Sequence, residues 1–436
     1  MGTLNTGNLP CCQILIMEIE QIVVNLPPRN KGKTGMIKSV KISNFKSVVD
    51  LTLELGSFNV LIGENGCGKS NILEAIAFGA AASADKLDNE FLGSRGIRVT
   101  KPDFMFSAFT NGKKKKPINI NISHDQGIYN YDLVNDPNNS KRWIDFGKEK
   151  ATEVIRNLFI AFIDKENSKN KFLSMLKNDM VVIPALNGIF NSFKNEDDYR
   201  NFFSVYNPST IKELFSHPDI SDYIVFSPEQ SSLRKFEEST QIYPLGIKGE
   251  GLFQYLKELT FEKKNAKILN EIKNNLGLLD WYEDFELPNH LLQNEFALSI
   301  KDRYLDPHLQ YFDQRSTNEG FLFLLFYSTL FISKTTPAFL AIDNIDTSFN
   351  PKLCAKLIQT LAALAKKKNK QVIVTTHNPA VLEGLNLKDD DQRLFVVSRN
   401  MEGHTRARRI EYKADRTIST SEAWRKGLIG GLPDNF

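Results

Sequence analysis

Apolar and polar residues alternate over residues 37–42 and again over residues 49–55. This period of two residues predicts two half-buried strands near the start of the chain. Residues 58–62 are apolar apart from Asn59 and predict a buried central strand. A glycine-rich turn follows, and the Ala- and Leu-rich residues after it predict a helix over about 70–82. The rest of the chain is best understood around this strand, turn and helix.

The turn between this strand and this helix has the spacing G-x-x-x-x-G-K-S over Gly63 to Ser70. Glycines let the backbone approach a ligand, and successive N–H groups at a helix N-terminus attract phosphate. In this pattern the lysine reaches the β- and γ-phosphates and the serine hydroxyl binds Mg²⁺. We therefore expect ATP and Mg²⁺ here; the alternative is a glycine-rich turn without a nucleotide. The expected nucleotide-binding residues of this loop are Gly63, Glu64, Asn65, Gly66, Cys67, Gly68, Lys69, Ser70 and Asn71.

The composition is that of an ordinary globular protein. Of 436 residues, 41% are hydrophobic and 25% are charged. The net charge is only +3, so the overall charge does not favour binding to nucleic acid or to a membrane surface. Four cysteines in so long a chain do not form a disulfide framework. No apolar run approaches 18 residues, and residues 1–20 lack the features of a signal peptide. We expect a cytoplasmic protein that has no membrane partner.

The patterns predict four segments. Residues 1–35 contain Pro27-Pro28 and a basic stretch and are expected to be a disordered extension, unless Met36 is the natural start. Residues 36–135 form a first lobe with the phosphate loop. Residues 151–290 are helical in parts, without repeats or a sustained heptad, and predict a mostly helical insertion. Residues 300–436 form a second lobe.

Several motifs resemble those of one ATPase class. Residues 44–47 read N-F-K-S, as in the SMC, RecF and OLD-like branch of ABC-type ATPases, and the phosphate loop follows in the expected place. The resemblance covers residues 36–100 and about 300–400, and it is to stand-alone bacterial AAA-family members. It implies an α/β fold, the P-loop NTPase fold of an ABC-type ATPase head, interrupted by the insertion. Gln126 is the nearest candidate for the Mg²⁺-contacting Gln of this class, although it also suits a hairpin turn.

The apolar run 339–342 ends in Asp343, which resembles the Walker B aspartate that faces Mg²⁺. This class then carries a glutamate base, but here the residue is Asn344. An amide can hold a water molecule but cannot accept its proton near neutral pH. Asp346 is two residues further on and could replace the base. We expect ATP hydrolysis to be slow or dependent on a partner.

Three further motifs complete the resemblance. Ser316 and Gly320, before the apolar run 321–331, resemble the signature motif that receives the partner protomer's γ-phosphate. The match lacks the usual leucine, and a capping box of Ser316 with Glu319 explains the serine equally well. Residues 348–351 resemble the D-loop that couples two protomers. His377, after the strand 371–375, takes the place of the switch histidine that contacts the γ-phosphate.

The resemblance implies a head-to-tail homodimer, or a higher homo-oligomer, that ATP joins and hydrolysis releases. Related ATPases act beside a nuclease or toxin in anti-phage systems such as Septu and PARIS, so our first hypothesis is an ATP-driven switch for such an effector. The second is a RecF- or SMC-like ATPase that binds DNA, for which Arg406, Arg408 and Arg409 offer a basic strand. The third, suggested by Asn344, is a nucleotide sensor or scaffold without hydrolysis. The stretch Pro244–Leu252 also resembles this bacterial group, but the sequence assigns it no role.

Overall fold

The structure is a computed structural model. The predicted extension, Gln126 and the helices expected over 152–205 lie outside the residues that it describes. It describes residues 35–109, 116–125, 127–149, 218–235, 242–287, 297–306, 308–309, 311–414 and 417–432.

A six-stranded sheet forms the centre of the fold, in the order β14-β13-β3-β12-β11-β7. All neighbours are parallel except β14, which runs antiparallel to β13. β3 is buried along its whole length, because helices cover both faces of a parallel sheet of this kind. The strands are β3 Phe58–Ile62, β7 Ile224–Phe226, β11 Phe339–Ile342, β12 Gln371–Thr376, β13 Gln392–Arg399 and β14 Thr405–Ile410.

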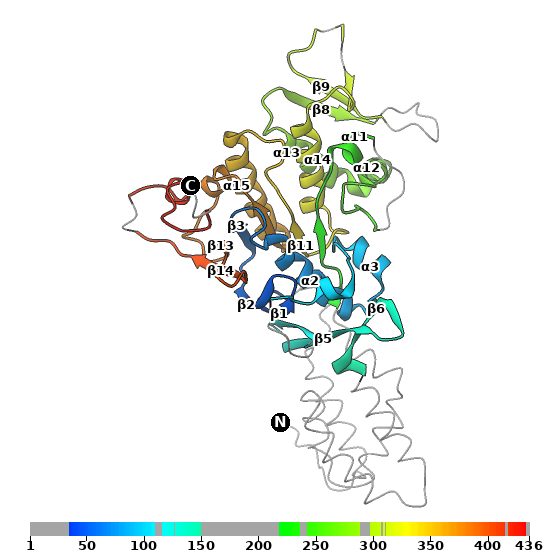
Figure 1. Cartoon of the computed structure of the whole chain (residues 1–436). Helices are drawn as coiled ribbons and strands as arrows, with labels where there is room; N and C mark the ends of the chain where they lie inside the picture. Colours follow the sequence, from blue (N-terminus) through cyan, green and yellow to red (C-terminus); the bar gives the residue numbers. More distant parts are fainter. Residues whose placement is uncertain are drawn as a thin grey trace, which may run out of the picture.

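A second, antiparallel sheet has the order β2-β1-β4-β5-β6. Its first strands are the alternating segments of the sequence, and the structure confirms them. Figure 1 shows this sheet at one end of the described part and the small sheet β10-β9-β8 toward the other end. The strands are β1 Ile37–Phe45, β2 Val48–Glu54, β4 Ile118–His124, β5 Gly127–Asp136, β6 Asn139–Asp145, β8 Tyr282–Glu286, β9 Ser299–Asp302 and β10 Phe312–Asp313.

Helix α2 contacts strands of both large sheets, and it is apolar and buried around most of its circumference. α14 is likewise buried, and it packs against α11, α13 and α15. The helices are α2 Lys69–Ser83, α3 Asn89–Ser94, α4 Pro102–Met105, α10 Pro218–Ser221, α11 Gln230–Lys235, α12 Leu252–Phe261, α13 Ala266–Leu276, α14 Glu319–Ile332, α15 Pro351–Lys368, α16 Ala380–Glu383 and α17 Thr420–Arg425, with a 3₁₀ turn at Lys263–Asn265.

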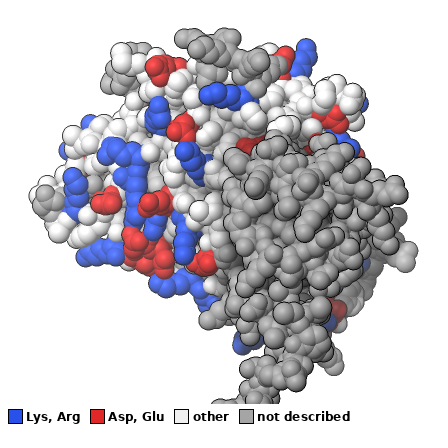
Figure 2. Space-filling model, turned by 90° about the horizontal axis from the view of Figure 1, so that it is seen from below, with Lys and Arg blue, Asp and Glu red and all other residues white. Residues whose placement is uncertain are grey.

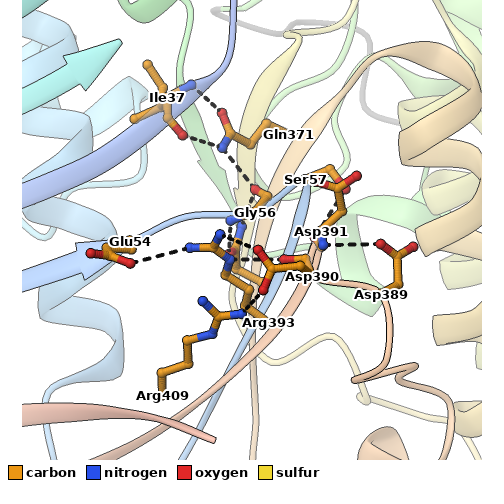
Figure 3. A network of polar contacts seen from close by, with 11 residues as sticks. Ile37, Glu54, Gly56, Ser57, Gln371, Asp389, Asp390, Asp391, Arg393 and Arg409 are labelled. Atoms are coloured by element: carbon orange, nitrogen blue, oxygen red, sulfur yellow. Dashed lines mark hydrogen bonds and ion pairs between the residues drawn. The ribbon is translucent and has the colours of Figure 1, made fainter. Parts of the chain in front are cut away.

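A buried glutamine joins the two large sheets (Figure 3). The Gln371 side chain accepts a hydrogen bond from Ile37 N at 2.9 Å and donates to Ile37 O and Gly56 O. Nearby, Asp390 pairs with both Arg393 and Arg409. The Gln371 hydrogen bonds hold the start of β1 against the start of β12 and thereby connect the antiparallel sheet to the central sheet.

Two strands lie in a part of the chain where the sequence predicts mostly helices. β7 lies within the range 151–290, which we expected to be a mostly helical insertion, yet it pairs with β11 in the central sheet. β8 also falls in that range and pairs with β9. A fully buried strand of three residues shows no alternation, so the sequence pattern does not reveal it. In the described part of the chain, none of the helices has the length and apolar character needed to cross a membrane.

Candidate nucleotide-binding site

The phosphate loop joins β3 to α2, and two of its glycines have left-handed backbones. Gly66 has φ 77° and Gly68 has φ 107°. A Cβ atom on Gly68 would lie 2.1 Å from Thr405 Oγ1. The Gly68 position therefore needs glycine for its conformation and for its space. The loop leads directly into the N-terminus of α2, the kind of position at which backbone N–H groups can bind phosphate.

The N-F-K-S hairpin supports the back of this loop. Ser47 Oγ lies 2.7 Å from Thr405 Oγ1, which donates to Cys67 O at 2.8 Å. Asn71 Nδ2 donates to the same Ser47 oxygen at 2.7 Å. Next to it, Lys46 forms an ion pair with Glu74, a buried carboxylate on α2. The hairpin, β14 and α2 thus hold the loop in one conformation without occupying its open side.

Lys69 lies beneath the loop and is only 5% exposed. Its ammonium donates hydrogen bonds of 2.9 Å to Gly63 O and to Glu64 O, and lies 3.4 Å from His377 Nδ1. Burial lowers its pKa, although the nearby Cys67 and Asp343 oppose this shift. Among the described residues no carboxylate lies within ion-pair distance of Lys69. Its direct contacts are two carbonyl oxygens, the Cys67 sulfur and the His377 ring nitrogen, none of which is a carboxylate, and this suits a site that receives an anion.

Asp343 follows β11 and lies directly beside the phosphate loop. Ser70 Oγ donates to Asp343 Oδ2 at 2.8 Å, although the two residues are 273 positions apart. Thr375 Oγ1 donates to the other carboxylate oxygen. The parallel strands bring these residues together, because their carboxyl ends meet at one edge of the sheet. A serine hydroxyl and a carboxylate are hard oxygen ligands of the kind that Mg²⁺ prefers.

The residues expected to act on water surround this pair. Asn344 is exposed, has φ 54° and donates its N–H to Thr375 Oγ1 at 2.9 Å. Asp346 accepts a hydrogen bond of 2.6 Å from Thr376 Oγ1. His377 follows β12 and contacts Lys69. The structure therefore brings Asp343, Asp346 and His377 to one edge of the sheet, with Asn344 at the surface.

Burial lowers the pKa of His377, and the Lys69 cation lowers it further. We predict that His377 in the nucleotide-free protein titrates below its usual value of about 6.5 and is neutral at pH 7. The unfolded chain binds this proton more readily, so the contribution of His377 to the free energy of unfolding falls as the pH drops below about 6.5. NMR of the imidazole measures the midpoint, and Lys69→Ala should raise it. A midpoint above 6.5 in the native protein would contradict this arrangement.

The signature-like loop does not form the predicted capping box. The N-cap of α14 is Asn318, whose side chain accepts from Phe321 N at 2.9 Å. Ser316 is exposed and instead binds Asp313 through its N–H and its hydroxyl. Glu319 accepts a hydrogen bond of 2.7 Å from Ser348 in the D-loop-like turn. Asparagine and serine are similarly favourable at an N-cap. Asn318 directly precedes the first helical residue, so it and not Ser316 is the N-cap.

Gly320 begins the buried part of α14, and a Cβ atom on it would lie 3.4 Å from Ser348 O. Among the described residues, no hydrogen bond joins Ser316 or Gly320 to the phosphate loop of the same chain. Sequence reasoning missed Thr375, Thr405 and Arg234, which hold Asp343, the phosphate loop and the signature-like loop. Two consecutive threonines at the end of β12 could have pointed to Thr375. No local pattern points to Thr405 or Arg234, because their partners are distant in the chain.

The fold and the motifs of this site are similar to those of AAA-domain proteins, and a comparison with protein families agrees. The family described as "AAA domain, putative AbiEii toxin, Type IV TA system" matches residues 58–383. The match spans most of the 436 residues, and the chain belongs to this family.

Curated relatives share shorter segments. The DNA replication and repair protein RecF of Lachnoclostridium phytofermentans is 28% identical over 167 residues, which is 32% of this chain and 46% of the relative. The chromosome partition protein Smc of Coxiella burnetii is 50% identical over 42 residues, 9% of this chain and 4% of the relative. The chain thus spans less than half the length of these relatives.

Solved structures of SMC heads are also similar. The SMC head domain from Thermotoga maritima is 13% identical, with a TM-score of 0.43, over 86% of this chain and 99% of that one. The Smc head domain with a coiled coil and joint from Pyrococcus yayanosii is 12% identical, with a TM-score of 0.46, over 90% of this chain and all of that one.

Proposed function

We propose that this protein is a Mg²⁺-dependent ATPase that works as an ATP-controlled switch. The observation that carries the proposal is the hydrogen bond between Ser70 and Asp343, formed beside the buried Lys69 ammonium. Phosphate-binding backbone, a cation and two hard oxygen ligands meet at one point. This set of donors fits a nucleoside triphosphate with its metal ion.

Each residue has a distinct proposed role. The glycine loop and Lys69 bind the β- and γ-phosphates, and Ser70 and Asp343 hold the metal. Bound Mg²⁺ neutralises charge that develops on the phosphate oxygens. Thr375 fixes the Asp343 carboxylate in the position that the metal needs. Neutral His377 can donate or accept a hydrogen bond at the γ-phosphate, depending on its tautomer.

Asn344 occupies the position of a water-holding group. Its amide orients the attacking water, and removal of the proton is then slow because an amide is not a base. Asp346 is held by Thr376 and supplies a nearby carboxylate. We therefore propose low intrinsic turnover, so that the ATP-bound state persists. Persistence of that state is what a switch requires, and it is compatible with stimulation by a partner.

We also propose that two copies complete each other's sites. Ser316 is exposed and lies just before α14, a helix of 14 residues that starts at Glu319 and has Gly320 in its first turn, so the loop could present a helix N-terminus to a phosphate. Glu319 ties this loop to the D-loop-like Ser348. ATP would join two such surfaces in a two-fold dimer, and hydrolysis would release them. The proposed setting is the bacterial cytoplasm, with an effector such as a nuclease or toxin under the control of this dimer.

A DNA-binding function like that of RecF is the second candidate, favoured by the shared segment of 167 residues. The basic strand β14 gives it little support. Arg409 pairs with Asp390, while Arg406 and Arg408 donate to backbone carbonyls. Figure 2 shows Lys and Arg side chains interspersed with Asp and Glu on the face that it presents. A turnover rate that DNA raises at low salt, and that salt suppresses, would favour this candidate.

The test is phosphate release together with size-exclusion mass, measured on the full chain with and without Mg·ATP. We expect slow phosphate release and an ATP-dependent increase in mass. Dimer formation without any phosphate release would support a sensor or scaffold instead. A protein that neither releases phosphate nor changes mass would overturn the proposal.

A further inference from the structure

One arginine holds the signature-like loop in place. Arg234, on α11, directs a single guanidinium nitrogen to three backbone carbonyls before α14. Nη1 donates to Gln314 O at 3.3 Å, to Thr317 O at 3.1 Å and also to Arg315 O. These carbonyls surround Ser316. A charged donor shared by successive carbonyls fixes the curvature of a loop far better than a neutral contact does.

The segment before α11 is held by the stretch Pro244–Leu252, to which the sequence alone assigns no role. Ser227 N donates to Ile247 O at 2.8 Å, and Glu229 N donates to Lys248 O at 2.9 Å. The side chains of Glu229 and Lys248 form an ion pair of 3.0 Å. The stretch therefore binds the segment that leads into α11, along its backbone.

The glycine in the middle of this stretch is required by space. Gly249 has φ 103°, and a Cβ atom there would lie 2.4 Å from Leu233 Cδ2. Leu233 is fully buried and directly precedes Arg234. The G-x-x-G-E-G spacing thus lets the stretch pack closely against α11, which sets the position from which Arg234 reaches the loop.

Contacts also connect α11 to Asp343, the residue that follows β11. Asp343 N donates to Phe226 O at 2.8 Å, at the end of β7, and α11 begins only four residues later. Phe226 and Phe326 of α14 pack with ring centroids 5.9 Å apart. A displacement at Asp343 therefore has a short path, through β7 and α11, to the signature-like loop.

We propose that Arg234 is a positioning residue that shapes the loop 314–317 for the nucleotide of a partner copy. The Pro244–Leu252 stretch holds Arg234 in place for this purpose. The inference rests on the proposed two-fold dimer, because the loop acts on the site of the other chain. Loss of Arg234 should leave ATP binding by its own phosphate loop intact and impair the opposite site.

Arg234→Gln should bind Mg·ATP like the native protein but turn over about 10- to 100-fold more slowly, since a loop shifted by about 1 Å misplaces its donors. Arg234→Lys should recover part of the rate because an ammonium also donates to carbonyls. Arg142→Gln, on the exposed edge strand β6, removes the same charge and should change neither quantity. If Arg234→Gln weakens Mg·ATP binding by the same factor as it slows turnover, the inference is overturned.

Mixing two inactive variants separates action on the partner from action on the same chain. In a 1:1 mixture of Arg234→Gln with Lys69→Ala, one site of each mixed dimer combines two intact halves. Turnover should therefore recover in the mixture, to about one quarter of the native rate if all pairings are equally frequent and the two sites act independently. If Arg234 serves its own chain's site, the mixture stays inactive.

A second mixture keeps failure of the inference distinct from failure of the dimer. Ser316→Glu places a negative charge on the exposed loop and repels phosphate without touching Arg234. Recovery in both mixtures with Lys69→Ala supports the inference. Recovery with Ser316→Glu but not with Arg234→Gln overturns the inference and leaves the dimer standing. Absence of recovery in both mixtures overturns the proposed dimer, and the inference with it.

Discussion

Lys69→Ala should reduce phosphate release by at least about 100-fold, the loss expected when a preorganised charged donor is removed from a transition state. The Lys69 ammonium is buried and contacts the carbonyl oxygens of Gly63 and Glu64, the Cys67 sulfur and His377, with no carboxylate in direct contact among the described residues. It is therefore already desolvated and aimed at the loop before phosphate arrives. The variant should also lose the ATP-dependent increase in mass.

Lys101→Ala is the matched control, because it removes an exposed lysine just before α4. It should release phosphate and dimerise like the native chain. Thermal unfolding of both variants shows whether they remain folded. Native turnover in a folded Lys69→Ala protein would place the phosphate site elsewhere in the molecule.

Asn344→Glu should raise turnover by about 100-fold, near the lower end of what a positioned general base contributes. Asn344 follows Asp343 directly, and its backbone N–H is fixed by Thr375. A carboxylate at this position could take the proton of the water that the amide only orients. The measurement is single-turnover phosphate release under saturating Mg·ATP, which separates chemistry from product release.

Asn344→Asp is the companion variant, because it adds the same charge on a shorter side chain. It should give a smaller gain, since its carboxylate lies farther from the water. A fall in turnover for both variants would show that Asn344 is itself adapted to the reaction. Asp346→Asn, made in the native background, then tests whether the neighbouring carboxylate supplies the base.

The phosphate loop could be predicted from sequence because its chemistry is local. Glycine, lysine and serine at fixed spacing favour this turn and indicate a phosphate ligand, as at Gly68, Lys69 and Ser70. Asp343 and His377 could be found because a buried parallel strand places its last residues at one edge of the sheet. The order of the motifs then indicated the class of ATPase.

The supporting contacts could not be predicted, because they depend on residues that are distant in sequence. Arg234 binds a loop about 80 positions away, and Thr405 binds the carbonyl of Cys67, 338 positions away. Neither residue type is unusual in its local sequence. The N-cap of α14 could not be predicted for a different reason. Ser316 and Asn318 both suit an N-cap, and only the residue at which the helix starts decides between them.

The most direct test of the shared pocket is Mg·ATP affinity in a cycle of native protein, Ser70→Ala, Asp343→Ala and the double variant, with EDTA as the metal-free reference. If both residues hold one metal ion, each single change should weaken Mg·ATP binding, and the double variant should lose little more than the worse single variant. With EDTA these differences should largely disappear. A native protein without measurable ATP affinity, or single losses that multiply in the double variant, would contradict the account.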